Sequence, residues 1–291
     1  MAANKRKPTQ CSTKTFHRDG TYFRKADSKT VKRFKCLICS KKYSLATTDK
    51  AYRHHKRRLN IPIARFLASG VSQRRIALNF NISKNTVAKK LKFLAKFCKA
   101  EVEALLSKQE SLVDHVQFDE LQTFEHSKCK PLSVAMVVSK KGRQILGFEV
   151  ASMPATGHLA KIARKKYGFR PDHRNKKLKA LFSSVKSKIH PRAVIESDEA
   201  SYYKNAVKNY FPKSKYKHYK GAPGAVTGQG ELKKVRWDPL FSINHTFAMC
   251  RANINRLFRR TWNTTKDPER LRDHLWIYTW FHNTKLTRFP A

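Results

Sequence analysis

The order of apolar patterns after residue 111 most constrains what this chain can fold into. Three strand-like segments come first, at residues 115–121, 133–138 and 145–151, and Lys140-Lys141-Gly142 fits a hairpin turn between the last two. A further strand at 193–197 then lies among helical stretches near 176–188, 201–210 and 243–262. Strands first, followed by alternating helices and strands, predict one mixed α/β domain over residues 111–291.

Two smaller segments precede this domain, so the chain is predicted to be multidomain. Residues 1–45 are basic and turn-rich, without a long periodic apolar pattern, which indicates a small module that needs a metal or another constraint. Residues 61–98 carry apolar positions at the spacing of short helices. We therefore expect a zinc-ribbon-like module, an all-α module and the α/β domain, in that order.

The charge of the chain indicates the class of its partner. Lysine and arginine number 63 against 20 aspartate and glutamate, a formal net charge of +43, yet 40% of the residues are hydrophobic and 11% aromatic. A folded chain with so much self-repulsion is expected to bind a polyanion, and nucleic acid fits best. No apolar run approaches the roughly 20 residues of a membrane span, and residues 1–7 lack the apolar stretch of a signal peptide. We therefore expect a cytoplasmic protein without a membrane partner, whose six cysteines are thiols or metal ligands.

The all-α module has the pattern of a helix-turn-helix. Gly70 is suited to a helix end, Ser72 and Ser83 to the N-caps of two successive helices, and residues 79–82 to the turn between them. The second helix, expected over 84–97, would present DNA-binding donors at exposed positions. These donors are Lys84, Asn85, Lys89, Lys90 and Lys92. The alternative is a charged surface on an ordinary helix pair.

The amino-terminal module contains a cysteine pair with the spacing of a zinc knuckle. Cys36 and Cys39 are separated by two residues, and a structural zinc site would need two more ligands upstream. Cys11 and His17 are the best candidates, although they are more widely spaced than a usual pair. A degenerate ribbon without zinc, or two buried thiols, is the alternative. Phe34 and Tyr43 would pack around the knuckle in either case.

Acidic residues are so scarce that two aspartates of the α/β domain are informative. Asp119 lies on a predicted strand with Val116 and Phe118 on the opposite face, and Asp198 follows the buried strand 193–197. Ligands gather at the carboxyl ends of strands in α/β sheets. Two carboxylates from distant segments can share divalent cations, which activate the attacking oxygen and stabilise the leaving oxygen in phosphoryl transfer. The alternative is that each aspartate is a turn cap or an ion-pair partner.

The order of these segments and their local sequence motifs resemble those of the insertion-sequence transposases of the IS-one-like, or ISXO-two-like, branch. The resemblance spans nearly the whole chain and includes Ile243-Asn244-His245 followed by Ala248, Arg251, Asn253, Arg256-Leu257 and Arg259-Arg260-Thr261. It implies a zinc ribbon, a helix-turn-helix and a ribonuclease-H-like catalytic domain. In that branch an aspartate on the first strand, an aspartate after the fourth and a glutamate at the start of a following helix hold two Mg²⁺ ions, for which Mn²⁺ can substitute. Asp119 and Asp198 match the first two.

The third position departs from the family pattern, because Asn244 stands where the glutamate is expected. An asparagine carbonyl can bind Mg²⁺ but brings no charge, so metal affinity should fall. Related transposases use asparagine or histidine at this position, and the resemblance therefore implies an Asp-Asp-Asn set. His245, Asp238 or Glu231 as the third ligand, and an inactivated enzyme, remain open. Glu120 and Glu199 would point away from the site on an extended segment.

Arg251 follows Asn244 by seven residues, nearly two helical turns, and so shares its face of the helix. It could hold a DNA phosphate near the metal ions, and the family also has a basic residue there. The alternative is a solvated arginine. The glycine-rich segment 221–230 lacks the Gly-Lys-Ser/Thr ending of a nucleotide-binding loop, so no nucleotide cofactor is expected.

These observations together predict a DNA transposase that cuts at the ends of its element and joins them to target DNA. Its partner would be double-stranded DNA, both the terminal repeats and the target, and we expect a homo-oligomer on that DNA in the nucleoid. A catalytically inactive, transposase-derived DNA-binding regulator is the main alternative. A basic structural protein of an RNA–protein particle is a further one.

Overall fold

A computed structural model describes residues 16–25, 28–44, 47, 51, 54–220, 238–258 and 263–287 of the 291. The chain divides into two compact units, Met1–Ile63 and Ala64–Ala291. The predicted Cys11 and Glu231, and the glycine-rich segment 221–230, lie outside the described residues.

The first unit contains a small antiparallel sheet of three strands in the order β1-β2-β3. Its strands are β1 (Phe16–Arg24), β2 (Lys29–Cys36) and β3 (Lys42–Ser44). Phe34 and Tyr43 stack with ring centroids 6.1 Å apart, and Phe16 meets Phe34 edge-on at 5.4 Å. This aromatic cluster confirms that Phe34 and Tyr43 pack beside the Cys36–Cys39 turn. Sequence periodicity does not reveal these strands because most of β1 is exposed and only Val31 and Cys36 of β2 are buried.

The second unit is built on a five-stranded mixed sheet in the order β6-β5-β4-β7-β8. Its strands are β4 (Val113–Phe124), β5 (Pro131–Ser139), β6 (Ile145–Ser152), β7 (Ile189–Asp198) and β8 (Lys215–Tyr219). Strands β4, β5 and β6 pair antiparallel, whereas β7 pairs parallel with both β4 and β8. The predicted mixed α/β domain is confirmed, and β8, which has no buried residue to mark it, is an addition.

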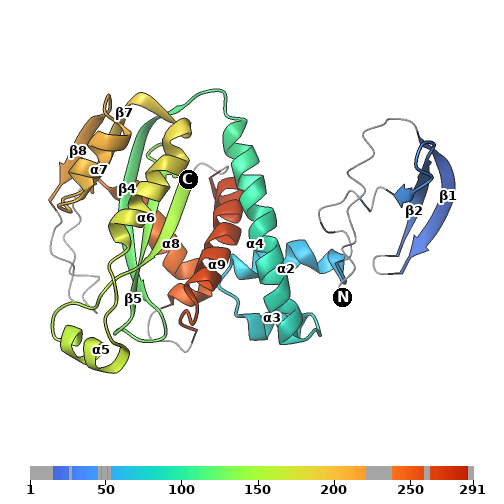
Figure 1. The fold of residues 1–291 in the computed structure, drawn as a ribbon, viewed down its shortest axis with the longest axis horizontal. Helices are drawn as coiled ribbons and strands as arrows, with labels where there is room; N and C mark the ends of the chain where they lie inside the picture. The colour runs from blue at the N-terminus through green and yellow to red at the C-terminus, as the bar shows by residue number, and fades with distance from the viewer. Residues whose placement is uncertain are drawn as a thin grey trace. The chain divides into compact units, whose positions relative to one another are not determined.

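Helices cover both faces of this sheet (Figure 1). They are α6 (Arg174–Val185), α7 (Tyr203–Tyr210), α8 (Phe241–Asn253) and α9 (Pro268–Phe281), whereas α5 (Leu159–Tyr167) lies below the sheet in Figure 1. One face packs on α6 and α7, where Phe118 meets Phe182 and Tyr203 at 5.0 and 4.7 Å. Helix α8 packs on β4 and β5 instead. Because side chains alternate along a strand, residues next to Phe118 on β4 point towards α8.

Gly147 sets the distance between β6 and α6. A Cβ at this position would lie 2.6 Å from Val185 Cγ1 and 3.0 Å from Leu181 Cδ1. Only a residue without a side chain allows the helix to approach the strand this closely.

Three helices precede the sheet: α2 (Asn60–Leu67), α3 (Gln73–Asn79) and α4 (Lys84–Ser107). The predicted caps are confirmed, since Ser72 Oγ accepts from the Arg75 amide at 3.3 Å and Ser83 Oγ from the Thr86 amide at 3.1 Å. The structure differs from the helix expected over 84–97, because α4 continues without a break to Ser107.

The carboxy-terminal half of α4 joins the core of the α/β domain. Val102 and Leu106 are buried in the cluster that contains Val116, Phe118 and Phe182. Residues 64–98 and 111–291 lie in the same compact unit, and α4 runs without a break through the boundary predicted between 98 and 111. The physical reason is the apolar stripe of α4, which does not stop at residue 98 but continues to Leu106.

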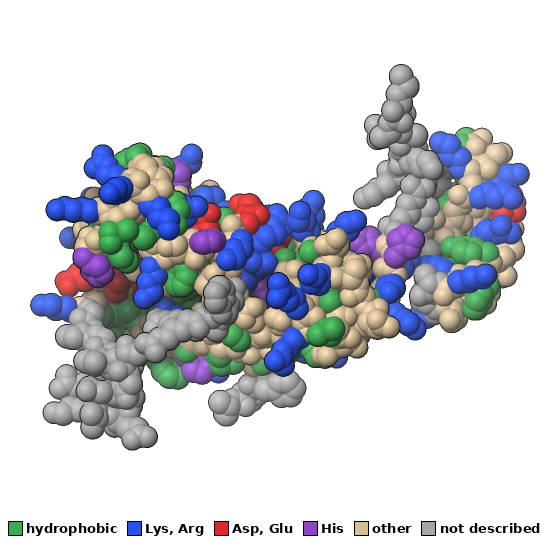
Figure 2. All heavy atoms as spheres, turned by 90° about the horizontal axis from the view of Figure 1, so that it is seen from below, with side chains coloured by type: hydrophobic (Ala, Val, Ile, Leu, Met, Phe, Trp, Pro, Cys, Tyr) green, Lys and Arg blue, Asp and Glu red, His purple; other side chains and the backbone are tan. Residues whose placement is uncertain are grey.

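The surface carries the charge that the composition requires. In Figure 2, Lys and Arg side chains are spread over the visible face, whereas Asp and Glu occur in a few small groups. Among the described residues, no helix is long and apolar enough to cross a membrane.

Candidate active site

Asp119 and Asp198 lie on neighbouring parallel strands and share a face of the sheet. In the β4–β7 ladder Gln117 is paired with Glu196, and each aspartate follows two residues later on its strand. Two residues along a strand return to the same face, so both carboxylates point to the side on which α8 packs. Asp119 is on the first strand of the sheet in chain order, and Asp198 is the last residue of the fourth. These are the positions that the family resemblance implied.

Burial and electrostatic repulsion disfavour ionisation of the Asp119–Asp198 pair. Burial, and then the neighbouring charge of Asp198, raise the pKa of Asp119 to about 7. Two weaker influences lower the pKa of Asp119. The Glu120 amide donates to Asp119 Oδ1 at 2.7 Å, and the positive charge of Arg251 favours the carboxylate. Burial also raises the pKa of Asp198, against the hydrogen bond from the Ala200 amide. Such a pair gains from a cation placed between its members.

An orphaned oxygen marks where that cation would fit. Asp198 Oδ1 is buried and has no hydrogen-bond partner among the described residues. A buried carboxylate oxygen without a partner is costly unless a ligand or ion satisfies it. Carboxylate oxygens are the ligands that Mg²⁺ and Mn²⁺ prefer, so Asp119 and Asp198 fit a divalent cation of this kind.

Asn244 lies in the first turn of α8, the helix that follows the sheet strands. Its side chain is exposed, and its Nδ2 donates to Asp238 Oδ2 at 2.9 Å. Within the described part of the chain no hydrogen bond joins Asn244 to either aspartate. Because Nδ2 is the donor to Asp238, the carbonyl oxygen is the atom of this side chain that could bind a metal.

The other candidates for a third ligand have different surroundings. His245 contacts Arg143 NH1 through Nδ1 at 2.7 Å, and burial together with the Arg143 charge lowers the pKa of His245. A cation already beside the ring opposes binding of a second one. Asp238 accepts from the Leu240 amide at 2.9 Å and from Asn244, so it is available only as a shared partner.

Glu120 and Glu199 point away, as the alternation predicted. Glu120 accepts hydrogen bonds from the Tyr202 hydroxyl at 2.5 Å and from Ser133 at 2.6 Å. Glu199 is exposed and lies 3.7 Å from the His218 ring. Across the described residues no three His, Cys, Asp or Glu side chains form a metal-binding group.

Arg251 belongs to the site through its charge. It lies in the last turn of α8, where its charge favours ionisation of Asp119. It also lines a hollow of about 490 Å³ along the last part of β4, from Leu121 to Phe124. A cation beside the two carboxylates is placed to contact a bound phosphate.

A third buried carboxylate, Glu196, was not anticipated from the sequence. Its side chain is 1% exposed and accepts from Lys140 Nζ at 2.8 Å, with His115 Nε2 at 3.1 Å. The Tyr219 hydroxyl and Gln117 Nε2 donate to it at 3.1 and 2.8 Å. Burial would raise the pKa of Glu196, but the hydrogen bonds from Lys140 and Gln117 and the nearby His115 ring outweigh it and hold the pKa below its usual value.

Gln117 connects this carboxylate to the start of α8. Its Nε2 donates to both Glu196 and the Pro239 carbonyl, the latter at 2.7 Å, and its Oε1 accepts from the Ile243 amide at 3.1 Å. The first turn of α8, which carries Asn244, is thereby attached to the strand that carries Asp119. The sequence does contain a signal for this contact. Gln117 and Glu196 each precede a site aspartate by two residues, and residues two apart on a strand point to the same face of the sheet.

The predicted DNA-binding donors on α4 are mostly where they were expected. Lys84, Asn85, Lys89 and Lys92 are exposed. Lys90 is 3% exposed, and burial lowers the pKa of its ammonium. The prediction that Lys90 is exposed is therefore wrong. It lies three residues after Val87 and four before Leu94, both buried, and so falls on the apolar stripe of the helix.

The predicted zinc ligands are only partly brought together. Cys36 ends β2, and its carbonyl accepts from the Ser40 amide at 3.0 Å in the tight turn that contains Cys39. In the β1–β2 ladder Phe16 is opposite Cys36 and His17 is opposite Lys35. His17 therefore projects from the other face of the sheet, because neighbouring residues on a strand alternate.

Solved structures similar to the chain include those of Mos1 mariner transposase. Its catalytic domain with raltegravir and Mg shares 15% identity over 67% of this chain and 90% of that chain, with a TM-score of 0.28. The Mos1 paired end complex with Mn shares 14% over 82% and 76%, with a TM-score of 0.27. The Mos1 strand transfer complex shares 13% over 80% and 79%, with a TM-score of 0.23. No protein-family model and no curated protein matches the chain.

Proposed function

We propose that the chain is a DNA transposase of the insertion-sequence kind, with a ribonuclease-H-like catalytic domain of the IS-one-like branch. The observation that carries the proposal is the Asp119–Asp198 pair: two desolvated carboxylates on adjacent strands, one with an orphaned oxygen, in a chain of net charge +43. Several other described carboxylates, such as Glu125, Glu149 and Glu196, are paired with lysine or arginine. Asp119 and Asp198 have too few cationic side chains around them to offset their burial. This favours a metal ion as their partner and a metal-dependent reaction on a polyanion.

The roles of the side chains follow from their surroundings. Asp119 and Asp198 would hold Mg²⁺ or Mn²⁺, with the Asn244 carbonyl as a third ligand. Bound there, the metal would supply charge stabilisation for in-line attack of water, and later of a 3′-hydroxyl, on a DNA phosphodiester. Arg251 would hold a phosphate oxygen of the DNA, and Gln117 would keep the first turn of α8 in position.

DNA recognition is assigned to α3 and α4 as a helix-turn-helix. Ser83 fixes the start of α4, from which Lys84, Asn85, Lys89 and Lys92 are exposed to solvent. Amides and lysines at the amino-terminal end of such a helix can contact base edges and phosphates. We propose that element ends are recognised through these side chains by a homo-oligomer bound to DNA in the nucleoid.

A structural zinc in the amino-terminal module is a separate proposal. It is supported by the spacing of Cys36 and Cys39 and by their tight turn. Metal analysis of the freshly purified protein tests it, with release of one equivalent of zinc expected for Cys36→Ser. Absence of zinc would favour the degenerate ribbon.

Incubation of the pure protein with DNA that carries its element ends, with Mg²⁺ or Mn²⁺, tests the transposase proposal. Mapping should find nicks at the element boundary and joined products. Asp119→Asn and Asp198→Asn should each abolish both and leave end binding intact. Glu199→Gln, which neutralises the exposed carboxylate next to Asp198, is the matched control and should stay active. Near wild-type nicking by either aspartate variant would refute the site.

A catalytically inactive regulator derived from a transposase remains the second candidate. It is favoured by one observation, the uncharged Asn244, whose amide is bonded to Asp238. The same assay separates the two functions. A wild-type protein that binds element ends but produces no nick with either metal would support the regulator.

A further inference from the structure

Two hollows in the second unit meet at Arg256. The hollow beside the candidate active site, of about 490 Å³, is lined by the end of β4, Lys128, Arg251 and Arg256. The other, of about 570 Å³, lies at the start of α3 and is lined by residues that include Arg74, Lys84, Arg256 and Lys266. Arg256 and Thr264 line both, so the hollows are adjacent parts of one depression. We call this depression the Arg256 groove.

The groove is strongly cationic. Its described lining includes no Asp or Glu, and it includes six basic side chains. These are Arg74, Lys84, Lys128, Arg251, Arg256 and Lys266. A hollow that concentrates charge of one sign focuses the field on an oppositely charged ligand.

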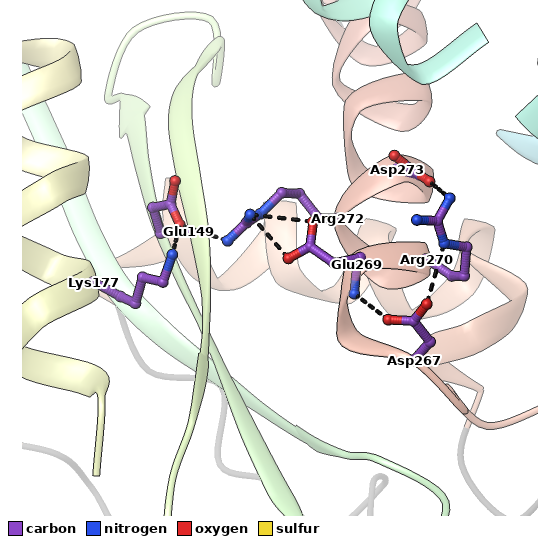
Figure 3. Close-up of polar contacts among 7 residues, drawn as sticks. All are labelled: Glu149, Lys177, Asp267, Glu269, Arg270, Arg272 and Asp273. Carbon is purple, nitrogen blue, oxygen red and sulfur yellow. Dashed lines mark hydrogen bonds and ion pairs between the residues drawn. The ribbon is translucent and has the colours of Figure 1, made fainter. Parts of the chain in front are cut away.

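Asp267 and Asp273, whose charges act on Arg256, form ion pairs at the start of α9 (Figure 3). Arg270 pairs with Asp267 at 3.3 Å and also with Asp273, and Arg272 pairs with Glu269 and, at 2.9 Å, with Glu149. Glu149 also accepts from Lys177 on α6. The pair between Arg272 and Glu149 attaches α9 to β6, and the acidic side chains of α9 are engaged by Arg270 and Arg272.

Arg256 at the centre is undersatisfied. Burial, and next the charge of Arg270, lower the pKa of the guanidinium, against smaller opposite influences of Asp267 and Asp273. Its Nε is buried and has no hydrogen-bond partner among the residues that the structure describes. A desolvated guanidinium with an unused donor is suited to an oxyanion, above all to phosphate.

The walls of the groove are held in place. Asn255 Nδ2 donates to the Gly70 carbonyl at 3.2 Å, and His274 Nε2 contacts the Leu67 carbonyl at 2.7 Å. Gly70 has φ +76°, and a Cβ there would lie 3.0 Å from Phe258 Cζ. Glycine is thus required both for the turn and for the close approach of the α2–α3 corner to the chain that follows α8.

We propose that the Arg256 groove binds the phosphate backbone of duplex DNA, with Arg256 as the central phosphate contact between α4 and the Asp119–Asp198 pair. That the polyanion is DNA rests on the proposed function; the groove itself rests on the geometry above. DNA held at the start of α4 would continue along the groove to Arg251.

Salt dependence of binding measures the phosphate interactions directly. Affinity of the full-length chain for a duplex of mixed sequence is measured by fluorescence anisotropy in EDTA over a range of KCl concentrations. Each phosphate that the protein neutralises contributes about 0.9 to the slope of log K against log [KCl]. The slope is negative, and the variant Lys128→Gln/Arg256→Gln/Lys266→Gln should make it shallower. Its magnitude should decrease by about 0.9 for each phosphate contact that the variant loses.

The matched control is Lys161→Gln/Lys179→Gln/Lys208→Gln, which removes the same charge from exposed positions on α5, α6 and α7. It should leave the slope close to that of the wild type. Arg256→Lys, which keeps the charge, should retain most of the slope. Because Arg256 is half-buried, Lys128→Gln/Lys266→Gln, with both side chains exposed, provides a variant whose folding is not at risk.

The outcomes separate the groove from the proposed function. Equal slope changes in the groove and control variants, or no change in either groove variant, would overturn the groove. If in that case the wild type still nicks DNA with Mg²⁺, the transposase proposal stands without it. A wild type that binds no duplex at all would overturn both.

Discussion

Two acidic centres, Glu196 and the Asp119–Asp198 pair, lie on one face of the same sheet, and their surroundings have opposite effects on the pKa of the carboxylates. Glu196 is surrounded by Lys140, His115, Gln117 and Tyr219, and its pKa is held below the usual value. Asp119 and Asp198 repel each other, and burial raises the pKa of both. The difference shows that carboxylate burial alone does not indicate function. The carboxylates that the chain leaves uncompensated are the ones available to a metal ion.

The comparison is tested most strongly by removing Glu196. Glu196→Ala leaves Lys140 and His115 beside a buried cavity without their anion, and it should lower the free energy of unfolding by about 2–4 kcal/mol. Urea denaturation at pH 7 measures the change. The control Glu199→Ala removes an exposed carboxylate from the same segment and should stay within about 0.5 kcal/mol. Equal effects of the two variants would mean that the Glu196 network is not stabilising.

The link between the two centres is tested by Gln117→Leu. The change keeps the side chain similar in size but makes it apolar, and it leaves the Ile243 amide and the Pro239 carbonyl without their partner, at a cost of about 1–3 kcal/mol. Hydrogen exchange at the Ile243 amide should become faster. Gln109→Leu, which removes an exposed glutamine–glutamine bond, is the control with little expected effect. Unchanged exchange in Gln117→Leu would show that Gln117 does not fix the start of α8.

The smallest effect, and one of opposite sign, is expected at Asp119. A carboxyl whose pKa rises on folding favours the folded state at low pH, and this contribution is lost as pH rises from about 4 to about 7. Asp119→Asn should therefore stabilise the metal-free protein at pH 8 by about 1–2 kcal/mol, after allowance for partial solvent exposure.

Urea denaturation at several pH values, with and without Mg²⁺, checks this expectation. Mg²⁺ should stabilise the wild type at pH 8 and have little effect on Asp119→Asn. Asp114→Asn, an exposed position on the same strand, is the control. Destabilisation by Asp119→Asn at pH 8 without metal would contradict the assignment of this aspartate as an uncompensated charge.

Local sequence patterns predicted much of what surrounds the site. The apolar strand around Asp119 and the apolar strand before Asp198 place both residues correctly, since strand alternation depends only on nearest neighbours. Ser72 and Ser83 are identified as caps because the capping bond spans three residues. Such features are encoded within a few positions of the chain.

Features that depend on distant partners could not be predicted in the same way. Gln117 and Glu196 meet across 79 positions of sequence, and neither residue alone carries a signal for that contact. The sequence analysis predicts an exposed Lys90 because lysine is rarely buried. The helical spacing from Val87 and Leu94, both buried, is the signal in the sequence that indicates the opposite. The extension of α4 beyond residue 97 could not be predicted, because burial of Val102 and Leu106 depends on the distant sheet residues against which they pack.

The continuity of α4 also affects how such a protein could evolve or be re-engineered. At 24 residues it is about 36 Å long, and it has exposed lysines at one end and core residues such as Leu106 at the other. A recombination event within this helix would cut through the hydrophobic core, so the amino-terminal part of α4 cannot be exchanged as a cassette. If the exposed first turns of α4 recognise the element ends, as proposed, new end sequences would have to be acquired by substitutions there, one side chain at a time.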